Sequence, residues 1–199
     1  NPEFKFPTNW IKSTKSCADV YVKLWNEYGE FGQMVDFETG KMTAPGTSSN
    51  GIACGALALC SKFFDETVYM DIAQKAGDFY YEEFVAKGIT SGGPGDIYQG
   101  MDSESAFGLL ESYIVLYELT QDAKWLRYAE DIGNQCASWV VSYNFDFPDS
   151  STFSKMDMKT TGTVIANVQN KHAAPGICTL SGSSLFRLYR YTGKDHYLE

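Results

Sequence analysis

The sequence predicts an all-α fold built as an α/α toroid of repeated helical hairpins, a partial (α/α)6 barrel with its long loops at one end. Three observations predict it: a repeated helix–turn–helix pattern, an alternation of uncharged and charged helices, and an alternation of long and short connections. Alternating strand patterns are scarce, and the best of them is the short segment 161–168.

The repeat is clearest at the turns between helices. Segments 116–126 and 188–198 carry Leu, Tyr, Thr and Leu at matching positions, and Trp125 in the first is matched by Tyr197 in the second. A weaker copy at 69–79 aligns with the residues that follow Trp125. The connecting turns are short and polar, so each copy predicts two antiparallel helices.

The helices fall into two classes that alternate along the chain. Nearly uncharged, apolar helices are expected at 48–64 and 175–189, and a similar but more acidic helix is expected at 103–120. Charged, amphipathic helices are expected at 10–28, 66–87 and 122–142. A helix that is apolar nearly all round is buried, so the first class predicts an inner ring and the second an outer layer. Pro175 suits the first turn of the third inner helix, where a missing N–H costs nothing.

Long connections always precede the uncharged helices, and short turns follow them. The long loops are expected at 30–48, 88–102 and 144–174. They should therefore meet at one end, above helix N-termini that favour anions. The first loop is expected to add a strand pair around a turn at Thr39–Gly40.

Inner helices introduced by long glycine-rich loops, followed by "LY..TG"-type turns, resemble the six-hairpin glycosidase superfamily. The resemblance implies a glycoside hydrolase that acts on an oligo- or polysaccharide by carboxylate acid/base catalysis. A complete barrel of that superfamily has six hairpins, and this chain supplies about half of them. We therefore expect residues 1–199 to be a single domain that forms the N-terminal fragment of a larger catalytic domain.

Three acidic residues in or just after the second loop are candidates for catalysis. Glycoside cleavage commonly needs one carboxyl with a raised pKa and one ionised partner, about 5–10 Å apart. Asp96, which follows "GGPG", is the first candidate for general acid or base, with Asp102 or Glu104 as its partner. The alternatives are structural: Asp102 immediately precedes a helix and suits an N-cap, and Glu104 complements the helix dipole.

The polar run "QNKH" in the third loop should reach the same end of the ring. Gln169, Asn170 and Lys171 are expected to bind sugar hydroxyls or a carboxylate, and His172 to shuttle protons at neutral pH. Asn170 and His172 also resemble the pair used by some polysaccharide lyases, which implies a lyase or uronate epimerase as an alternative. A solvated, non-catalytic His172 is the other interpretation.

Aromatic side chains in the loops offer faces for sugar rings. The candidates are Tyr98, Phe145, Phe147 and Phe153, whose alternative role is to anchor their loops to the core. A non-catalytic sugar-binding or scaffold domain therefore stands as a third functional hypothesis.

Composition excludes several other classes. A net charge of −9 argues against nucleic acid, and no apolar run is long enough to span a membrane. The five cysteines form no CxxC or Cys/His cluster, so they are expected to be buried apolar thiols without a metal or another cofactor. They leave the compartment open, with a periplasmic or extracellular location preferred. An incomplete ring should also expose an apolar edge suited to self-association.

Overall fold

The computed structural model describes residues 6–93, 98–170, 172–176 and 178–198. Its α-helices are α1 (Thr8–Tyr28), α2 (Ile52–Phe64), α3 (Thr67–Glu83), α4 (Ser103–Thr120), α5 (Ala123–Ser138), α6 (Thr152–Lys155) and α7 (Ser183–Thr192). Short 3-10 turns are η1 (Ser49–Gly51), η2 (Val85–Lys87), η3 (Leu180–Gly182) and η4 (Asp195–Tyr197). Strands β1 (Met34–Val35) and β2 (Met42–Ala44) pair antiparallel. The mostly helical class predicted from the sequence is confirmed.

One helix boundary differs from the prediction. The third uncharged helix was expected to begin at Pro175, but α7 begins at Ser183. Leu180 and Gly182 have φ angles of 53° and 73°, in the left-handed region, so a continuous α-helix cannot run through them. The segment 161–168 forms isolated bridges rather than a strand. The predicted strand pair in the first loop is present as β1 and β2.

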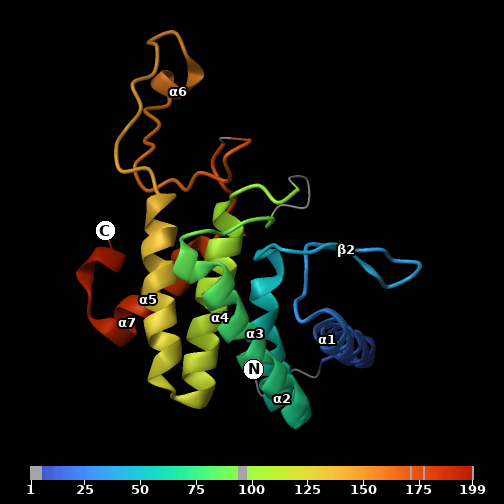
Figure 1. Cartoon of the computed structure of the whole chain (residues 1–199). Helices are drawn as coiled ribbons and strands as arrows, with labels where there is room; N and C mark the ends of the chain where they lie inside the picture. Colours follow the sequence, from blue (N-terminus) through green and yellow to red (C-terminus); the bar gives the residue numbers. More distant parts are fainter. Residues whose placement is uncertain (1–5, 94–97, 171, 177, 199) are drawn as a thin grey trace.

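Helix α4 occupies the centre of the molecule, between α2, α5 and α7 (Figure 1). Its residues are buried on nearly all sides, as the uncharged sequence predicted. Helix α7 is held against α4 by Arg187, whose guanidinium lies 2.7 Å from Glu111 and 2.6 Å from Glu118. Within the described residues no helix is long and apolar enough to cross a bilayer.

The repeated turns have the same hydrogen bonds in both clear copies. The Thr120 hydroxyl donates to Leu116 O at 2.7 Å, and the Thr192 hydroxyl donates to Leu188 O at 2.9 Å. The following residue is left-handed in each case, with φ of 57° at Gln121 and 68° at Gly193. The sequence repeat therefore reflects one turn geometry used twice.

A large aromatic residue begins the second element of each hairpin and is buried against the preceding one. Trp125 packs on Gly77 of α3, where an added Cβ would lie 2.9 Å from Trp125 Cζ3. Tyr197 packs on Gly133 of α5, where an added Cβ would lie 3.3 Å from Tyr197 Cε1. The buried Tyr69 is the equivalent residue in the first hairpin, and its hydroxyl bonds to α1. Successive hairpins thus meet through a repeated contact.

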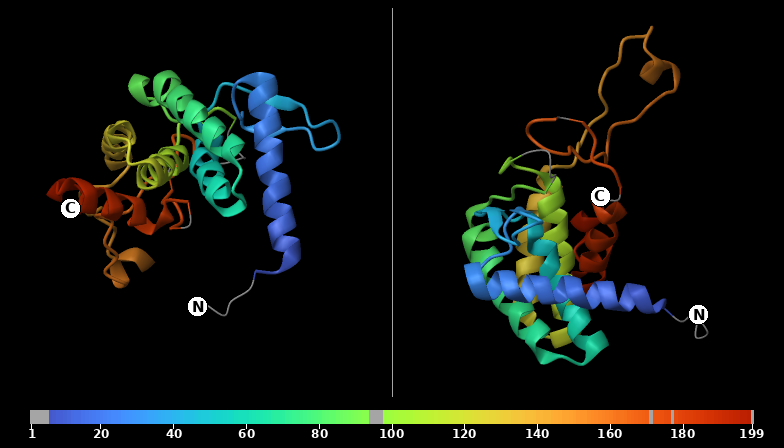
Figure 2. Two further views of the ribbon diagram at one scale, coloured as in Figure 1. Left: turned by 90° about the horizontal axis from the view of Figure 1, so that it is seen from below. Right: turned by 90° about the vertical axis from the view of Figure 1, so that its right-hand side faces the viewer.

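Helix α1 is arranged differently from α3 and α5. It contacts α2 and α3 but lies across the bundle, as both views in Figure 2 show. Helices α3 and α5 run alongside their uncharged partners, as expected of outer helices (Figure 1). Helix α1 therefore lies on the outside with most of its residues exposed, but it crosses the bundle instead of running along it.

The three long loops touch one another at one end of the bundle (Figure 1). Ser48 and Ser91 join the first and second loops, since Ser91 N donates to Ser48 Oγ at 2.9 Å. Ser103 N donates to Ala166 O at 2.9 Å, which ties the third loop to the start of α4. The side chains of the three long loops therefore lie above the N-termini of α2, α4 and α7.

We expect Gly77→Val to lower the free energy of unfolding by about 3 kcal/mol, because the added methyl groups enter space held by the Trp125 ring. Urea denaturation measures the loss. The matched control is Lys75→Val, exposed on the same helix, which carries the same β-branched residue and should cost less than about 1 kcal/mol. Equal losses in the two variants would show that the contact does not hold the hairpins together.

Candidate functional site

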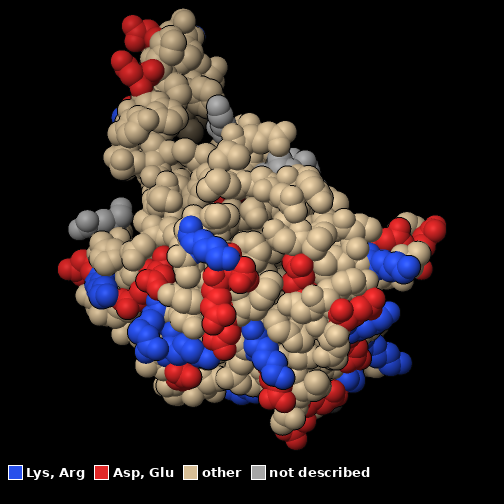
Figure 3. Space-filling view, in the orientation of Figure 1, with Lys and Arg blue, Asp and Glu red and all other residues tan. Residues whose placement is uncertain are grey.

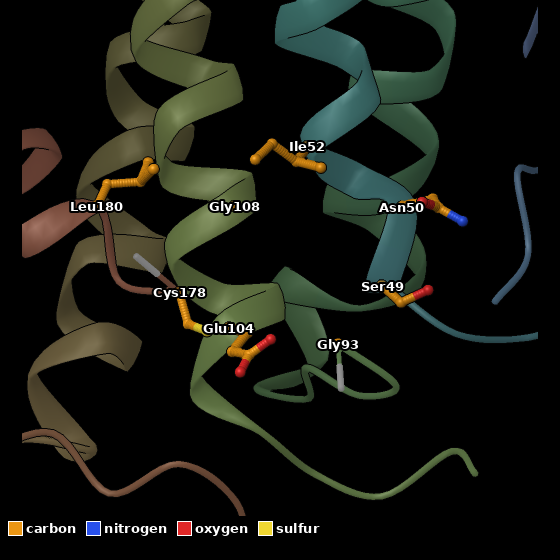
Figure 4. Close-up of a pocket in the computed structure, with 8 residues that line it drawn as sticks. All are labelled: Ser49, Asn50, Ile52, Gly93, Glu104, Gly108, Cys178 and Leu180. Atoms are coloured by element: carbon orange, nitrogen blue, oxygen red, sulfur yellow. The ribbon is translucent and has the colours of Figure 1, made fainter. Parts of the chain in front are cut away.

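A cavity of about 290 Å³ lies at the loop end, between the N-terminal turns of α2 and α4. Its walls come from η1, the second loop, α4 and the segment before α7 (Figure 4). The lining residues are Ser49, Asn50, Ile52, Gly93, Glu104, Gly108, Cys178 and Leu180. Residues distant in the sequence therefore converge on one space of ligand-binding size.

Glu104 is the charged residue of this lining. It lies in the first turn of α4, and its carboxylate points into the space toward Gly93 (Figure 4). The Cys178 thiol lies beside this carboxylate in the lining of the cavity (Figure 4). Burial, with a smaller contribution from Glu104, raises the pKa of the Cys178 thiol to about 11, so the thiol stays protonated. The cavity wall therefore presents a carboxylate next to a neutral thiol.

The opposite wall of the cavity is apolar and in part strained. Ile52 and Leu180 both project toward the space from either side of Gly108 (Figure 4). A leucine with φ of 53° is unusual, because its side chain crowds the backbone in the left-handed region. Such strain is retained where the surroundings enforce it and is common at functional sites.

Asp102 is a buried N-cap of α4, as the structural alternative expected. Its carboxylate accepts from Ser105 N at 2.6 Å, from Ser105 Oγ at 3.0 Å and from Gly93 N at 2.9 Å. Burial raises the pKa of the Asp102 carboxyl, although these donors favour its charged form. Asp102 is absent from the lining of the Glu104 cavity and instead fixes the loop that forms one wall.

Gly93 lies against both Asp102, which caps α4, and Glu104, which lines the cavity. An added Cβ at this position would collide with Asp102 Oδ1 and lie 2.9 Å from Glu104 Cβ, so the close approach requires glycine. Asp96, the first candidate for general acid or base, follows in the same loop but lies outside the described residues, as does Lys171. Their roles stay predictions.

His172 lies in a different cavity from Glu104. That second cavity, of about 310 Å³, is lined by aromatic residues of the third loop. The His172 ring Nδ1 is 2.9 Å from Ala173 O, and the side chain is exposed. The structure therefore does not place His172 and Glu104 on one wall.

The remaining predicted binding residues are exposed. Tyr98 is 60% exposed on the second loop. Gln169 and Asn170 are also exposed, and their backbone N–H groups donate to Asn167 Oδ1 at 3.1 and 2.7 Å. None of the three lines the Glu104 cavity.

Two residues that the sequence did not single out organise this end of the molecule. The buried Asn167 forms an Asx turn beneath Gln169 and Asn170, and the "N-V-Q-N" pattern is compatible with such a turn. Cys178 was expected to be an inert apolar thiol, and only the fold brings it to Glu104. All five cysteines are free.

Metal coordination has no candidate among the residues described: no group of three His, Cys, Asp or Glu side chains there is arranged to hold an ion. No protein-family model matches the chain, and a search of curated proteins finds no significant match.

We expect Asp102→Ala to lower the free energy of unfolding by about 2–3 kcal/mol, because it removes an N-cap and leaves buried N–H groups without an acceptor. Thermal and urea denaturation at neutral pH measure this loss in the free energy of unfolding. The matched control is Asp122→Ala, which removes the exposed N-cap of α5 and should cost about 1 kcal/mol. A loss no larger than that of the control would contradict the anchoring role of Asp102.

Alkylation tests the thiol environments. In the folded protein the exposed Cys17 should react rapidly with iodoacetamide at neutral pH, whereas Cys178 should react slowly because its pKa is raised to about 11. The buried Cys54 and Cys136, whose pKa values are also raised by burial, should react only after unfolding. Peptide mass spectrometry follows each site, with Cys17→Ser as the control. Rapid labelling of Cys178 would argue against the raised pKa expected from its burial beside Glu104.

Proposed function

We propose that this chain is a carbohydrate-active domain, a glycoside hydrolase that cleaves an oligo- or polysaccharide by carboxylate acid/base catalysis. The observation that carries the proposal is the Glu104 carboxylate on the wall of a cavity at the end where the long loops meet. A carboxylate with a partly apolar surround suits proton transfer to a glycosidic oxygen.

In the proposed mechanism Glu104 serves as the acid/base group. Protonated Glu104 donates its proton to the oxygen of the departing sugar as the glycosidic bond breaks, and a second carboxylate forms the new bond to the anomeric carbon. Glu104 then takes a proton from the water that displaces this carboxylate. Cys178 lies beside Glu104 in the cavity wall, and Asp102 holds Gly93 and the start of α4 in place. Asp96 is proposed as the second carboxylate, because it follows Gly93 by three positions in the same loop.

The hairpin packing supports a toroid as the underlying architecture. Trp125 on Gly77 and Tyr197 on Gly133 are equivalent contacts, and repetition of one contact is how a ring of hairpins would grow. Helix α2 also carries an exposed apolar stripe that includes Ile52, Leu59 and Phe63. We propose that ring closure by further hairpins, or self-association, covers this stripe.

The two alternative functions make different demands on the site. A lyase or epimerase needs His172 beside the reacting sugar, but His172 lines a different cavity from Glu104. A non-catalytic sugar-binding domain would bind sugar at the loop end without transferring a proton. Of the three, the hydrolase is the function for which a carboxylate is in place.

We expect Glu104→Gln to reduce hydrolysis at least about 100-fold, because the amide cannot donate or accept the catalytic proton. Release of reducing ends from a panel of oligo- and polysaccharides measures it. Glu38→Gln, an exposed change in the β1–β2 connection, is the matched control and should keep full activity. Asp96→Asn tests the second carboxylate.

Hydrolysis that survives in Glu104→Gln would remove this residue from the mechanism, and unchanged rates in Asp96→Asn would remove Asp96. Sugar binding without turnover in the wild-type chain would instead favour the non-catalytic alternative. A new ultraviolet-absorbing double bond in products from uronate polymers would favour the lyase.

A further inference from the structure

The third loop includes an arm, residues 142–162, that projects from the loop end and carries α6 near its tip (Figure 1). Its base is held by Asn144, whose side-chain oxygen accepts from Thr160 N at 3.0 Å and from Thr161 N at 3.2 Å. The Thr160 hydroxyl in turn donates to Tyr143 O at 2.8 Å. These hydrogen bonds therefore hold the two ends of the arm together at its base.

The arm carries a continuous row of aromatic rings. The centroid distances are 5.4 Å from Tyr143 to Phe145, 6.3 Å from Phe145 to Phe147, and 5.2 Å from Phe147 to Phe153. Phe153 is 54% exposed and Phe145 is 44% exposed. Exposed contiguous aromatics of this kind mark a binding surface, because leaving them in water is unfavourable.

Three of these four rings line the second cavity, which lies where the arm joins the loop end. Phe145, Phe147 and Phe153 form its aromatic side, and Thr163, Lys159 and His172 contribute polar groups. Its volume of about 310 Å³ falls at the lower end of small-ligand sites. Ring faces combined with hydroxyl, amine and imidazole groups match a sugar ring, which has apolar C–H faces and a polar edge.

Charge favours a neutral ligand at this surface. Lys159 is paired with Asp157 at 2.6 Å, so it offers little net positive charge to a polyanion. In the view of Figure 3 the acidic and basic residues gather over the helical body, whereas the loop end is largely uncharged apart from the arm. The arm carries Lys155 and Lys159 as well as Asp146, Asp149 and Asp157. A net charge of −9 on the chain opposes a polyanionic glycan further.

The arm cavity is joined to the candidate catalytic end by a short segment. Ala166 N donates to His172 O at 2.8 Å, while Ala166 O accepts from Ser103 N at the start of α4. Ser103 immediately precedes Glu104. A chain molecule held on the arm therefore lies on the same end of the protein as the Glu104 cavity.

We propose that the aromatic cavity of the arm is a binding site for a neutral polysaccharide, in which Phe145 and Phe153 stack on sugar rings away from the point of cleavage. The proposal extends the proposed function and rests on its substrate class. It assigns the arm to substrate capture and leaves proton transfer to Glu104. His172 then contributes a polar contact at the cavity edge.

Affinity electrophoresis of the whole chain in gels containing a soluble neutral glycan (mixed-linkage glucan, galactomannan or arabinoxylan) tests the proposal, with polygalacturonate as the anionic comparison. We expect retardation by at least one neutral polymer. The double variant Phe145→Ala/Phe153→Ala should weaken the apparent association constant about tenfold or more, because two stacking faces are lost. Phe153→Tyr keeps a ring and should remain within about twofold of wild type.

The matched control is Phe37→Ala, because Phe37 is 92% exposed in the β1–β2 connection, and it should leave retardation unchanged. The proposal is overturned if no neutral polymer retards the wild type, if only polygalacturonate does so, or if the double variant binds like wild type. Light scattering adds a further test: a wild-type dimer that becomes a monomer in the double variant, with retardation intact, would make the arm a self-association surface instead.

Glu104→Gln separates this proposal from the proposed function. It should bind neutral polymer as tightly as wild type while losing hydrolysis. If Glu104→Gln still hydrolyses but the arm variants lose binding, the catalytic assignment fails and the arm site stands. If Glu104→Gln loses hydrolysis and the arm variants bind normally, the catalytic assignment stands and the arm site fails.

Discussion

The contact between an aromatic ring and a helical glycine is the constraint on which the hairpin packing depends. At Gly77 the absent side chain lets Trp125 approach the backbone of the preceding hairpin, and Gly133 does the same for Leu188 and Tyr197. Because packed interiors tolerate little extra volume, this contact sets the spacing between successive hairpins. The identical threonine hydrogen bonds at the turns then direct each aromatic toward the same place.

That spacing decides where the loops can go. With α2, α4 and α7 side by side, the long connections all cover the same end of the bundle. Asp102 ties them down, since its carboxylate caps α4 and accepts from Gly93 in the loop above. Polar groups that are buried must be satisfied, so a cap of this kind also positions the neighbouring Glu104. Asp102 thus contributes both to the stability of the loop end and to the geometry of the cavity.

Charge is divided between the two parts of the molecule. The helical body carries most of the ion pairs, including the bridge from Arg187 to Glu111 and Glu118 that fastens α7. The loop end offers aromatic rings, hydroxyls and a carboxylate. This division is compatible with the neutral polysaccharide proposed as the ligand of the loop end.

The sequence by itself determined the helical class, the hairpin repeat and the cap at Asp102, because periodicity, short polar turns and N-cap preference are local properties. It misplaced the start of α7, since the left-handed backbone at Leu180 depends on the surrounding packing. Only the tertiary structure brought Cys178 to Glu104 and separated His172 from both. Such proximities join segments far apart in the chain, and no local pattern encodes the distance between them.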